Sequence, residues 1–164
     1  MKHLTLVAML LVLAVGAGTA NVAAEPTNVE QSQSQAAAAC FLPKTKFVLH
    51  AGLAFGAFHR YLYKPFKAHA FTGASKVKTI AKAAAAALFV YHETNEALKQ
   101  AHCSKTLTVL VSPLTAVVAA VKSAGSTLKS GGVPDIGALG SEFDAIGNSA
   151  GGIGVPIKDI AHGL

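Results

Sequence analysis

Residues 47–58 in the central part of the chain are almost entirely hydrophobic or small. Pro43 stands just before this run, and proline is tolerated in the first turn of a helix because the amide it lacks has no partner there. The run is shorter than the roughly 20 residues that cross a bilayer. The pattern therefore predicts a buried helix that begins near Pro43 and that Pro65 ends.

A second helix is predicted from Ser75, which is suited to be its N-cap, to His102. The segment is rich in alanine, which has the highest helix propensity. Its larger hydrophobic residues recur at steps of three and four, as on one face of a helix. The residues of this predicted face are Val77, Ile80, Ala84, Leu88, Tyr91 and Leu98.

The third segment has the clearest helical period. Ser112 and Pro113 interrupt it and suit a helix start, so we expect a kink or a short break there. Gly131 and Gly132 end it. Its periodic positions are Leu107, Leu110, Val111, Leu114, Val117, Val118, Val121 and Leu128.

After Pro134 the hydrophobic spacing indicates a weaker helix, diluted by glycines. Its periodic positions are Ile136, Leu139, Phe143 and Ile146. The last stretch, residues 151–164, is predicted to be irregular, with Ile153, Val155 and Ile157 packed back on the helices. Alternating strand patterns are absent. The fold class predicted is all-α: a small helical bundle built on an antiparallel helical hairpin, with a Gly-rich irregular C-terminal tail.

The N-terminus has the order of a secretory signal peptide: Lys2, the apolar run Leu4 to Val15, and then small residues. Cleavage after Ala20 or Ala24 fits the small-residue rule, and we favour Ala24. We therefore expect a cleaved signal at 1–24, a disordered polar leader at 25–39, the bundle at 40–150 and the tail at 151–164, with no transmembrane segment after signal removal.

The two cysteines, Cys40 and Cys103, would meet an oxidising compartment after export, where pairing is the rule. An antiparallel hairpin about a loop at residues 65–73 places Cys40 beside Cys103. We therefore predict one disulfide. Gly52 and Gly56 share a face of the first helix, and we expect this face to pack closely on the alanines at 83–87.

Charge changes the picture more than composition does. The chain has 14 Lys and Arg against 8 Asp and Glu, a net charge of +6, and its residues 44–82 contain eight cations and no acid. These cations are Lys44, Lys46, Arg60, Lys64, Lys67, Lys76, Lys78 and Lys82. Many of them surround the loop of the hairpin and alternate with aromatic residues. We call this part of the chain the basic aromatic turn.

Basic side chains beside amphipathic rings are typical of proteins that bind anionic surfaces, such as lipid phosphates or wall-linked phosphate polymers. The expected mechanism is electrostatic attraction followed by shallow aromatic insertion. The competing interpretation is a solvated end of the bundle without a ligand. Export makes nucleic acid an unsuitable partner. The residues assigned to anionic-surface binding are Arg60, Lys64, Lys67, Lys76, Lys78, Tyr61, Tyr63 and Phe66.

An alternative hypothesis is an extracellular carrier of haem or a metal. His59 and Tyr63 are one helical turn apart, and His69 follows on the predicted loop, so the three side chains could face one ligand.

Two motifs that resemble catalytic ones lack the required context. The stretch 147–151 (GNSAG) fits a nucleophile elbow, but no strand precedes it. The stretch 92–96 (HETNE) has Glu96 where a helical zinc site needs a second histidine. We interpret 92–96 as an ordinary solvated helix end in which His92 and Glu96 form a weak pair. No enzymatic activity and no resident cofactor are expected.

The segment FHRYLYKPFKAHAF at 58–71, followed by KAAAAALFVYHETNEALKQA at 82–101, resembles small exported helical proteins of high-GC Gram-positive bacteria over about residues 41–130. The resemblance implies export and the same order of segments, but no activity. A looser likeness to secreted haem carriers rests on helices, a disulfide and Tyr and His residues. Together the sequence predicts a secreted, non-enzymatic protein at the cell envelope, and it indicates no oligomeric state.

Overall fold

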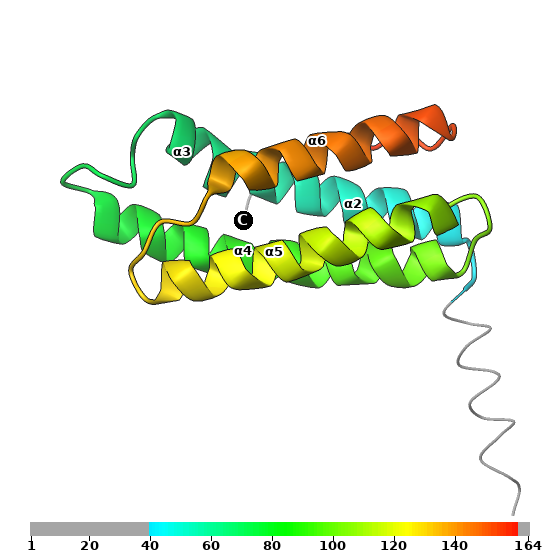
Figure 1. Ribbon diagram of the computed structural model, residues 1–164, viewed down its shortest axis with the longest axis horizontal. Helices are drawn as coiled ribbons and strands as arrows, with labels where there is room; N and C mark the ends of the chain where they lie inside the picture. Colours follow the sequence, from blue (N-terminus) through cyan, green and yellow to red (C-terminus); the bar gives the residue numbers. More distant parts are fainter. Residues whose placement is uncertain (1–39, 161–164) are drawn as a thin grey trace, which may run out of the picture.

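The computed structural model describes residues 40–160, and four long helices in it lie along a common axis (Figure 1). The described elements are α2 (Pro43–Phe58), the π-helical turn η1 (His59–Tyr63), α3 (Lys64–Lys67), α4 (Lys76–His102), the 3₁₀ turn η2 (Thr108–Leu110), α5 (Val111–Lys129) and α6 (Ile136–Gly152). No strand occurs among these residues, so the prediction of an all-α helical bundle is confirmed. The predicted signal peptide, its cleavage site, the polar leader and residues 161–164 lie outside the described residues.

The first helix does not end at Pro65, contrary to the prediction. It continues through η1 and α3 to Lys67. A proline in a regular α-helix would collide with the carbonyl four residues earlier. The chain avoids this by widening the turn just before Pro65, where the amide of Lys64 donates to the carbonyl of His59, five residues back. The helix then stops at Ala68, and His69 follows with φ of 54°.

The helices α2 and α4 form the predicted antiparallel hairpin. The turn between α3 and α4 lies at one end of the bundle, and the start of α2 lies at the other (Figure 1). At that second end a disulfide joins Cys40 to Cys103, which are 63 residues apart in sequence and 5.2 Å apart between Cα atoms. The predicted pairing is therefore confirmed.

The buried face of α4 only partly follows the predicted one: Ile80, Ala84, Tyr91 and Leu98 are half-buried against the core, but two residues of the predicted face are not. Val77 and Leu88 are 74% and 51% exposed. The face that packs on α2 and α5 consists mainly of small side chains, and a Cβ added to Gly125 of α5 would lie 3.5 Å from the Cβ of Ala87. Helices that approach this closely leave room only for small residues between them. The buried hydrophobic residues of α4 are Ala83, Ala86, Ala87, Val90, Ala97 and Ala101.

The third segment behaves largely as predicted. The helix changes from the 3₁₀ turn η2 to the α-helix α5 at Val111. Pro113 therefore lies in the first turn of α5, where its missing amide costs nothing. Gly131, with φ of 81°, follows the helix end. The buried residues are Leu107, Leu110, Leu114, Val117, Val121, Ala124 and Leu128, whereas Val111 and Val118 are half-buried.

By length and composition, Thr108–Lys129 is the one described helix that could cross a membrane, with mean hydropathy 1.5. Core helices of globular bundles meet the same criteria, and the periodic residues of α5 pack against α4 in this way.

The helix α6 is confirmed and runs slightly further than the predicted bundle boundary, to Gly152. The carboxylate of Asp135 caps its start by accepting from the amide of Ala138 at 2.9 Å. Phe143 stacks on Phe58 with ring centroids 4.5 Å apart. The remaining buried hydrophobic residues of α6 are Ile136, Leu139, Ile146 and Ala150.

The irregular tail after α6 returns to α2. Val155 is buried, and the amide of Ile160 donates to the carbonyl of Gly52 at 3.0 Å. A Cβ at Gly52 would lie 2.5 Å from the carbonyl oxygen of Lys158, and one at Gly56 would overlap Ile160. The prediction that these glycines face the alanines at 83–87 is therefore wrong, because they accommodate the tail.

Candidate anion-binding surface

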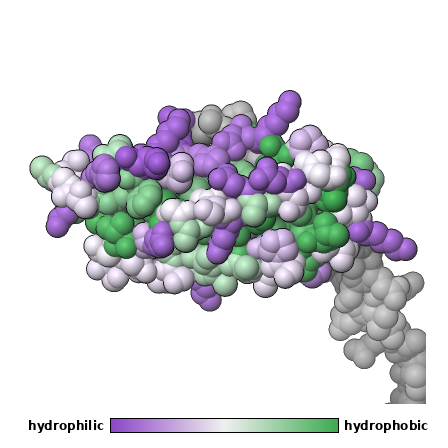
Figure 2. All heavy atoms as spheres, turned by 45° about the horizontal axis from the view of Figure 1, so that its top comes forward, coloured by the Kyte–Doolittle hydropathy of each residue, from purple (hydrophilic) through white to green (hydrophobic). Residues whose placement is uncertain are grey.

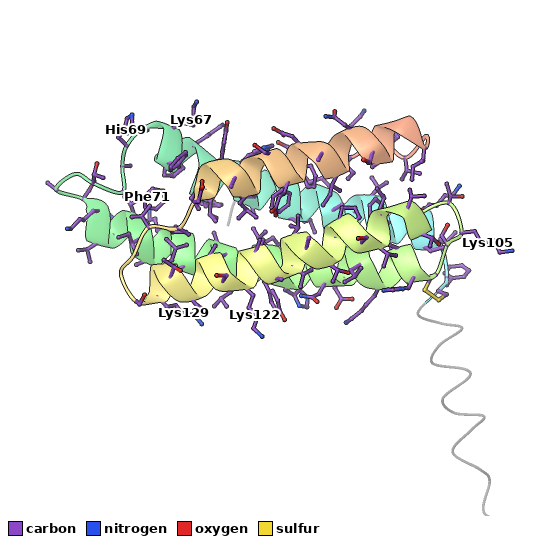
Figure 3. All side chains as sticks on the ribbon, in the orientation of Figure 1. Lys67, His69, Phe71, Lys105, Lys122 and Lys129 are labelled. Atoms are coloured by element: carbon purple, nitrogen blue, oxygen red, sulfur yellow. A yellow bond between two sulfur atoms is a disulfide. The ribbon has the colours of Figure 1, made fainter. Side chains whose placement is uncertain are left out.

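The α3–α4 turn carries basic side chains at the end of the bundle remote from the disulfide. In Figure 3, Lys67 and His69 point outward from this turn, and Lys105 lies at the opposite end. Phe71, by contrast, is buried at 4% exposure and anchors the turn to the core. The turn is thus fixed at its base and solvated at its surface.

A shallow, open depression of about 1010 Å³ lies between this turn and the C-terminal tail. Arg60, Lys64 and Lys67 all line it. They are four and three residues apart on continuous helix, a spacing that places side chains on one face. The acid in its lining is Asp159, whose Oδ2 accepts a hydrogen bond from Nδ1 of His59 at 2.6 Å.

A second depression, of about 390 Å³, lies between the same turn and α4. Arg60 and Lys64 line this one too, and Lys82 of α4 completes its basic lining. We call Arg60, Lys64, Lys67 and Lys82 the cation ridge. None of the ion pairs found among residues 40–160 involves a member of the ridge. The ridge cations therefore form no ion pair with a described carboxylate, although Asp159 lines the larger depression with three of them.

The structure brings together only part of the predicted basic site. Lys76 and Lys78 are exposed at the start of α4 and line neither depression. Lys82 belongs to the surface but was not assigned to it from the sequence. The signal that could have found it is its distance from the start of α4: two turns into the helix, it reaches back beside η1.

The aromatic residues of the turn are mostly structural. The ring of Tyr63 packs between Phe58 and α6, where a Cβ added to Gly140 would lie 3.0 Å from it. Phe66 is half-buried beside Gly137 of α6. These rings hold the turn against α6 and are not free to insert into a bilayer, contrary to the expected mechanism.

Tyr61 has a different role. The guanidinium of Arg60 lies over its ring, 5.4 Å from the centroid, which is within the range of a cation–π contact. The half-buried ring thus positions the guanidinium that both depressions share.

The three residues of the haem hypothesis are not gathered around one cavity. His59 and Tyr63 line the larger depression, and their ring centroids are 5.8 Å apart. His69 is exposed on the turn and lines none of the depressions described here (Figure 3). Within residues 40–160 no group of three His, Cys, Asp or Glu side chains could hold a metal ion.

The segment 92–96 is only partly the solvated helix end that was predicted. Glu93 is 7% exposed and accepts a hydrogen bond from Nδ1 of His50 on α2 at 2.7 Å. Sequence reasoning missed this pair because its partners are on different helices. Glu96 pairs with Lys99 at 2.6 Å, and this hydrogen bond lowers the pKa of the Glu96 carboxyl from its ordinary value of 4.5.

Comparisons with protein-family models, curated proteins and solved structures find no match to this chain. They give no support to the resemblance to exported bacterial proteins. Function must therefore be argued from the surface itself.

Proposed function

We propose that this protein binds an anionic phosphate polymer of the cell envelope through the cation ridge. One observation carries the proposal: Arg60 and Lys64 line two adjoining depressions, flanked by Lys67 on one side and Lys82 on the other. Four cations that line two depressions with shared walls match a ligand that carries charges in series. A single small anion would need only one of the depressions.

The chemistry of the side chains suits phosphate. A guanidinium offers two parallel N–H donors to two phosphate oxygens, and lysine ammonium groups act as compact point charges. The contact between Arg60 and the Tyr61 ring keeps the guanidinium pre-organised, so less side-chain entropy is lost on binding.

A polymer fits better than a bilayer. Tyr63 and Phe66 are engaged with α6, and Val77 is the exposed large hydrophobic residue nearest the turn in sequence. Phe41, Leu42 and Val109 are instead exposed at the disulfide end, where Figure 2 also shows hydrophobic atoms beside the grey segment. The rings that the sequence assigned to insertion are thus packed against the protein itself, which disfavours aromatic insertion into a membrane at the ridge.

Export is part of the proposal. The Cys40–Cys103 disulfide is typical of proteins that reside in oxidising compartments. It supports the secretory signal proposed for the first 24 residues and a place of action outside the cytoplasm.

Titration of the purified protein with inorganic polyphosphate at several salt concentrations tests the proposal. We expect the logarithm of the affinity to fall linearly with the logarithm of the salt concentration, as for other polyelectrolytes. In Arg60→Ala/Lys64→Ala the slope should decrease by about 0.7 for each cation removed. The matched control is Lys122→Ala/Lys129→Ala, which removes two exposed cations of α5 that line neither depression (Figure 3).

Equal losses of affinity in the two double variants would show that net charge alone attracts the polymer. That result, or the absence of binding, would overturn the proposed function. Phosphatidylglycerol vesicles serve as a second ligand, and tighter binding to them than to polyphosphate would favour a membrane surface instead.

A further inference from the structure

An apolar groove continues from the cation ridge along α4. It has a volume of about 370 Å³ and is lined by Tyr61 of η1 and by Lys82, Ala85, Ala86 and Phe89 of α4. Apart from Lys82, the lining offers rings and methyl groups. The groove exists because α4 has small side chains at two successive positions while Tyr61 and Phe89 stand on either side.

A smaller hollow of about 90 Å³ extends the groove between α2 and α4. It shares Tyr61 and Phe89 with the groove, and Leu53, Gly56 and Ala57 of α2 form part of its wall. Arg60 also lines the hollow, so the apolar walls extend beyond the groove with a cation at their border.

The groove and the basic depression beside it share Tyr61 and Lys82. A ligand could thus contact the rings and methyl groups at one end and the cations Arg60, Lys64 and Lys82 at the other. Among residues 40–160, no carboxylate lines the groove, the hollow or that depression. The combined site is apolar at one end and positively charged at the other.

We propose that this site binds a single-chain amphiphile with an anionic headgroup. The acyl chain lies in the groove between Tyr61 and Phe89, and the headgroup lies against the cation ridge. The inference rests on the anion-binding role proposed above for the ridge and adds a ligand class to it. A free fatty acid and a lysophospholipid share this chemistry.

Size and charge both select this occupant. The groove volume is near the lower limit of small-molecule sites, about 300 Å³, so it suits one hydrocarbon chain better than the paired chains of a bilayer lipid. A neutral amphiphile would leave the cations without a partner, and a polyanion would leave the apolar wall exposed to water.

The test measures binding by isothermal titration calorimetry below the micelle concentrations of the ligands. The probes are tetradecanoate, myristoyl lysophosphatidylglycerol, neutral monomyristoylglycerol and inorganic polyphosphate. Ala85→Trp fills the groove from an exposed position of α4. Its matched control is Ala119→Trp at an exposed position of α5. Lys82→Met removes a cation but keeps an apolar side chain of similar length.

We expect at least one anionic amphiphile to bind about tenfold more tightly than the neutral one, which corresponds to about 1.4 kcal/mol. Ala85→Trp should lose at least that factor and keep its affinity for polyphosphate, whereas Ala119→Trp should match the wild type. Lys82→Met should weaken the anionic amphiphiles and leave the neutral one unchanged. Tighter binding of tetradecanoate identifies a fatty acid, and tighter binding of the phosphate-bearing probe identifies a lysophospholipid.

Unchanged amphiphile binding in Ala85→Trp would overturn this inference, and retained polyphosphate binding would leave the proposed function standing. Amphiphile binding without polyphosphate binding would instead overturn the proposal that the protein binds a phosphate polymer and would support the amphiphile site in the groove. Ile160 is the last described residue, and it lines the adjoining hollow. Amphiphile binding only after deletion of 161–164 would show that the chain occupies its own groove, and would also overturn the inference.

Discussion

Removing the disulfide should destabilise the protein by several kcal/mol without changing its fold. Cys40 and Cys103 close a loop of 63 residues across the α2–α4 hairpin. In the chain-entropy treatment, closing a loop of that length lowers the conformational entropy of the unfolded chain and so raises its free energy by about 4 kcal/mol at 25 °C. Because the penalty falls on the unfolded state, the helices of Cys40→Ala/Cys103→Ala should still form.

The assay is urea unfolding followed by circular dichroism, with the wild type measured in the presence and absence of reductant. We expect the free energy of unfolding to fall by about 4 kcal/mol in the double variant and the reduced wild type to approach the same value. The midpoint of thermal unfolding should fall by roughly 10–20 °C for a domain of this size. A loss under about 1 kcal/mol would refute the reasoning, because two helices that are held together by packing alone would not need the bond.

Two further predictions concern ionisable pairs. Because the hydrogen bond to Lys99 lowers the pKa of Glu96, the pair stabilises the fold above pH 4.5, and this contribution is lost as the pH falls through the lower pKa of the folded protein. An NMR titration of Lys99→Met should show the Glu96 pKa returning toward 4.5, and an unchanged pKa would contradict the assignment. His50→Ala should cost about 3 kcal/mol in urea unfolding because it removes the hydrogen-bond partner of the buried Glu93 side chain. His92→Ala should cost little, because His92 is exposed and lies 4.0 Å from Glu93; equal effects would show that the His50–Glu93 pair carries no special weight.

The sequence was sufficient to predict the helices because their signals are local. Periodic hydrophobic residues located α5 and α6, and Ser75 stands where α4 begins, although its side chain makes no capping hydrogen bond. The errors concern interactions between elements. The predicted stripe of α4 failed at Val77 and Leu88, and it left out most of the buried alanines, because the hydrophobic period gives little weight to alanine, whereas close helix packing requires it.

The path of the chain around Pro65 was also beyond local reasoning. A proline normally ends a helix, but the π-helical turn at 59–63 lets the helix pass it. This turn places Arg60 and Lys64 along one edge that faces both the tail and α4. The same irregularity that defeated the boundary prediction therefore builds the centre of the candidate site.

The candidate site was predicted in part. A run of basic residues is visible in any sequence, so Arg60, Lys64 and Lys67 were identified correctly as neighbours. The sequence did not assign Lys82 to the candidate site, and it did assign Lys76 and Lys78. Which of these lysines line the depressions depends on which turn of α4 lies beside η1. The tail, and not the alanines at 83–87, packs on Gly52. Local sequence patterns could not show this, because the contact joins residues more than a hundred positions apart.

Mapping of the polyphosphate contact by NMR tests the central claim most directly. In a titration of the isotopically labelled protein, we predict that the largest amide shift changes fall at residues 59–68 and 79–82, around the cation ridge, and that the amides near Lys122 and Lys129 of α5 stay unchanged. Shift changes that follow the exposed lysines of α5 as strongly as those of the ridge would contradict the account, because they would mean that no part of the surface is built to hold the anion.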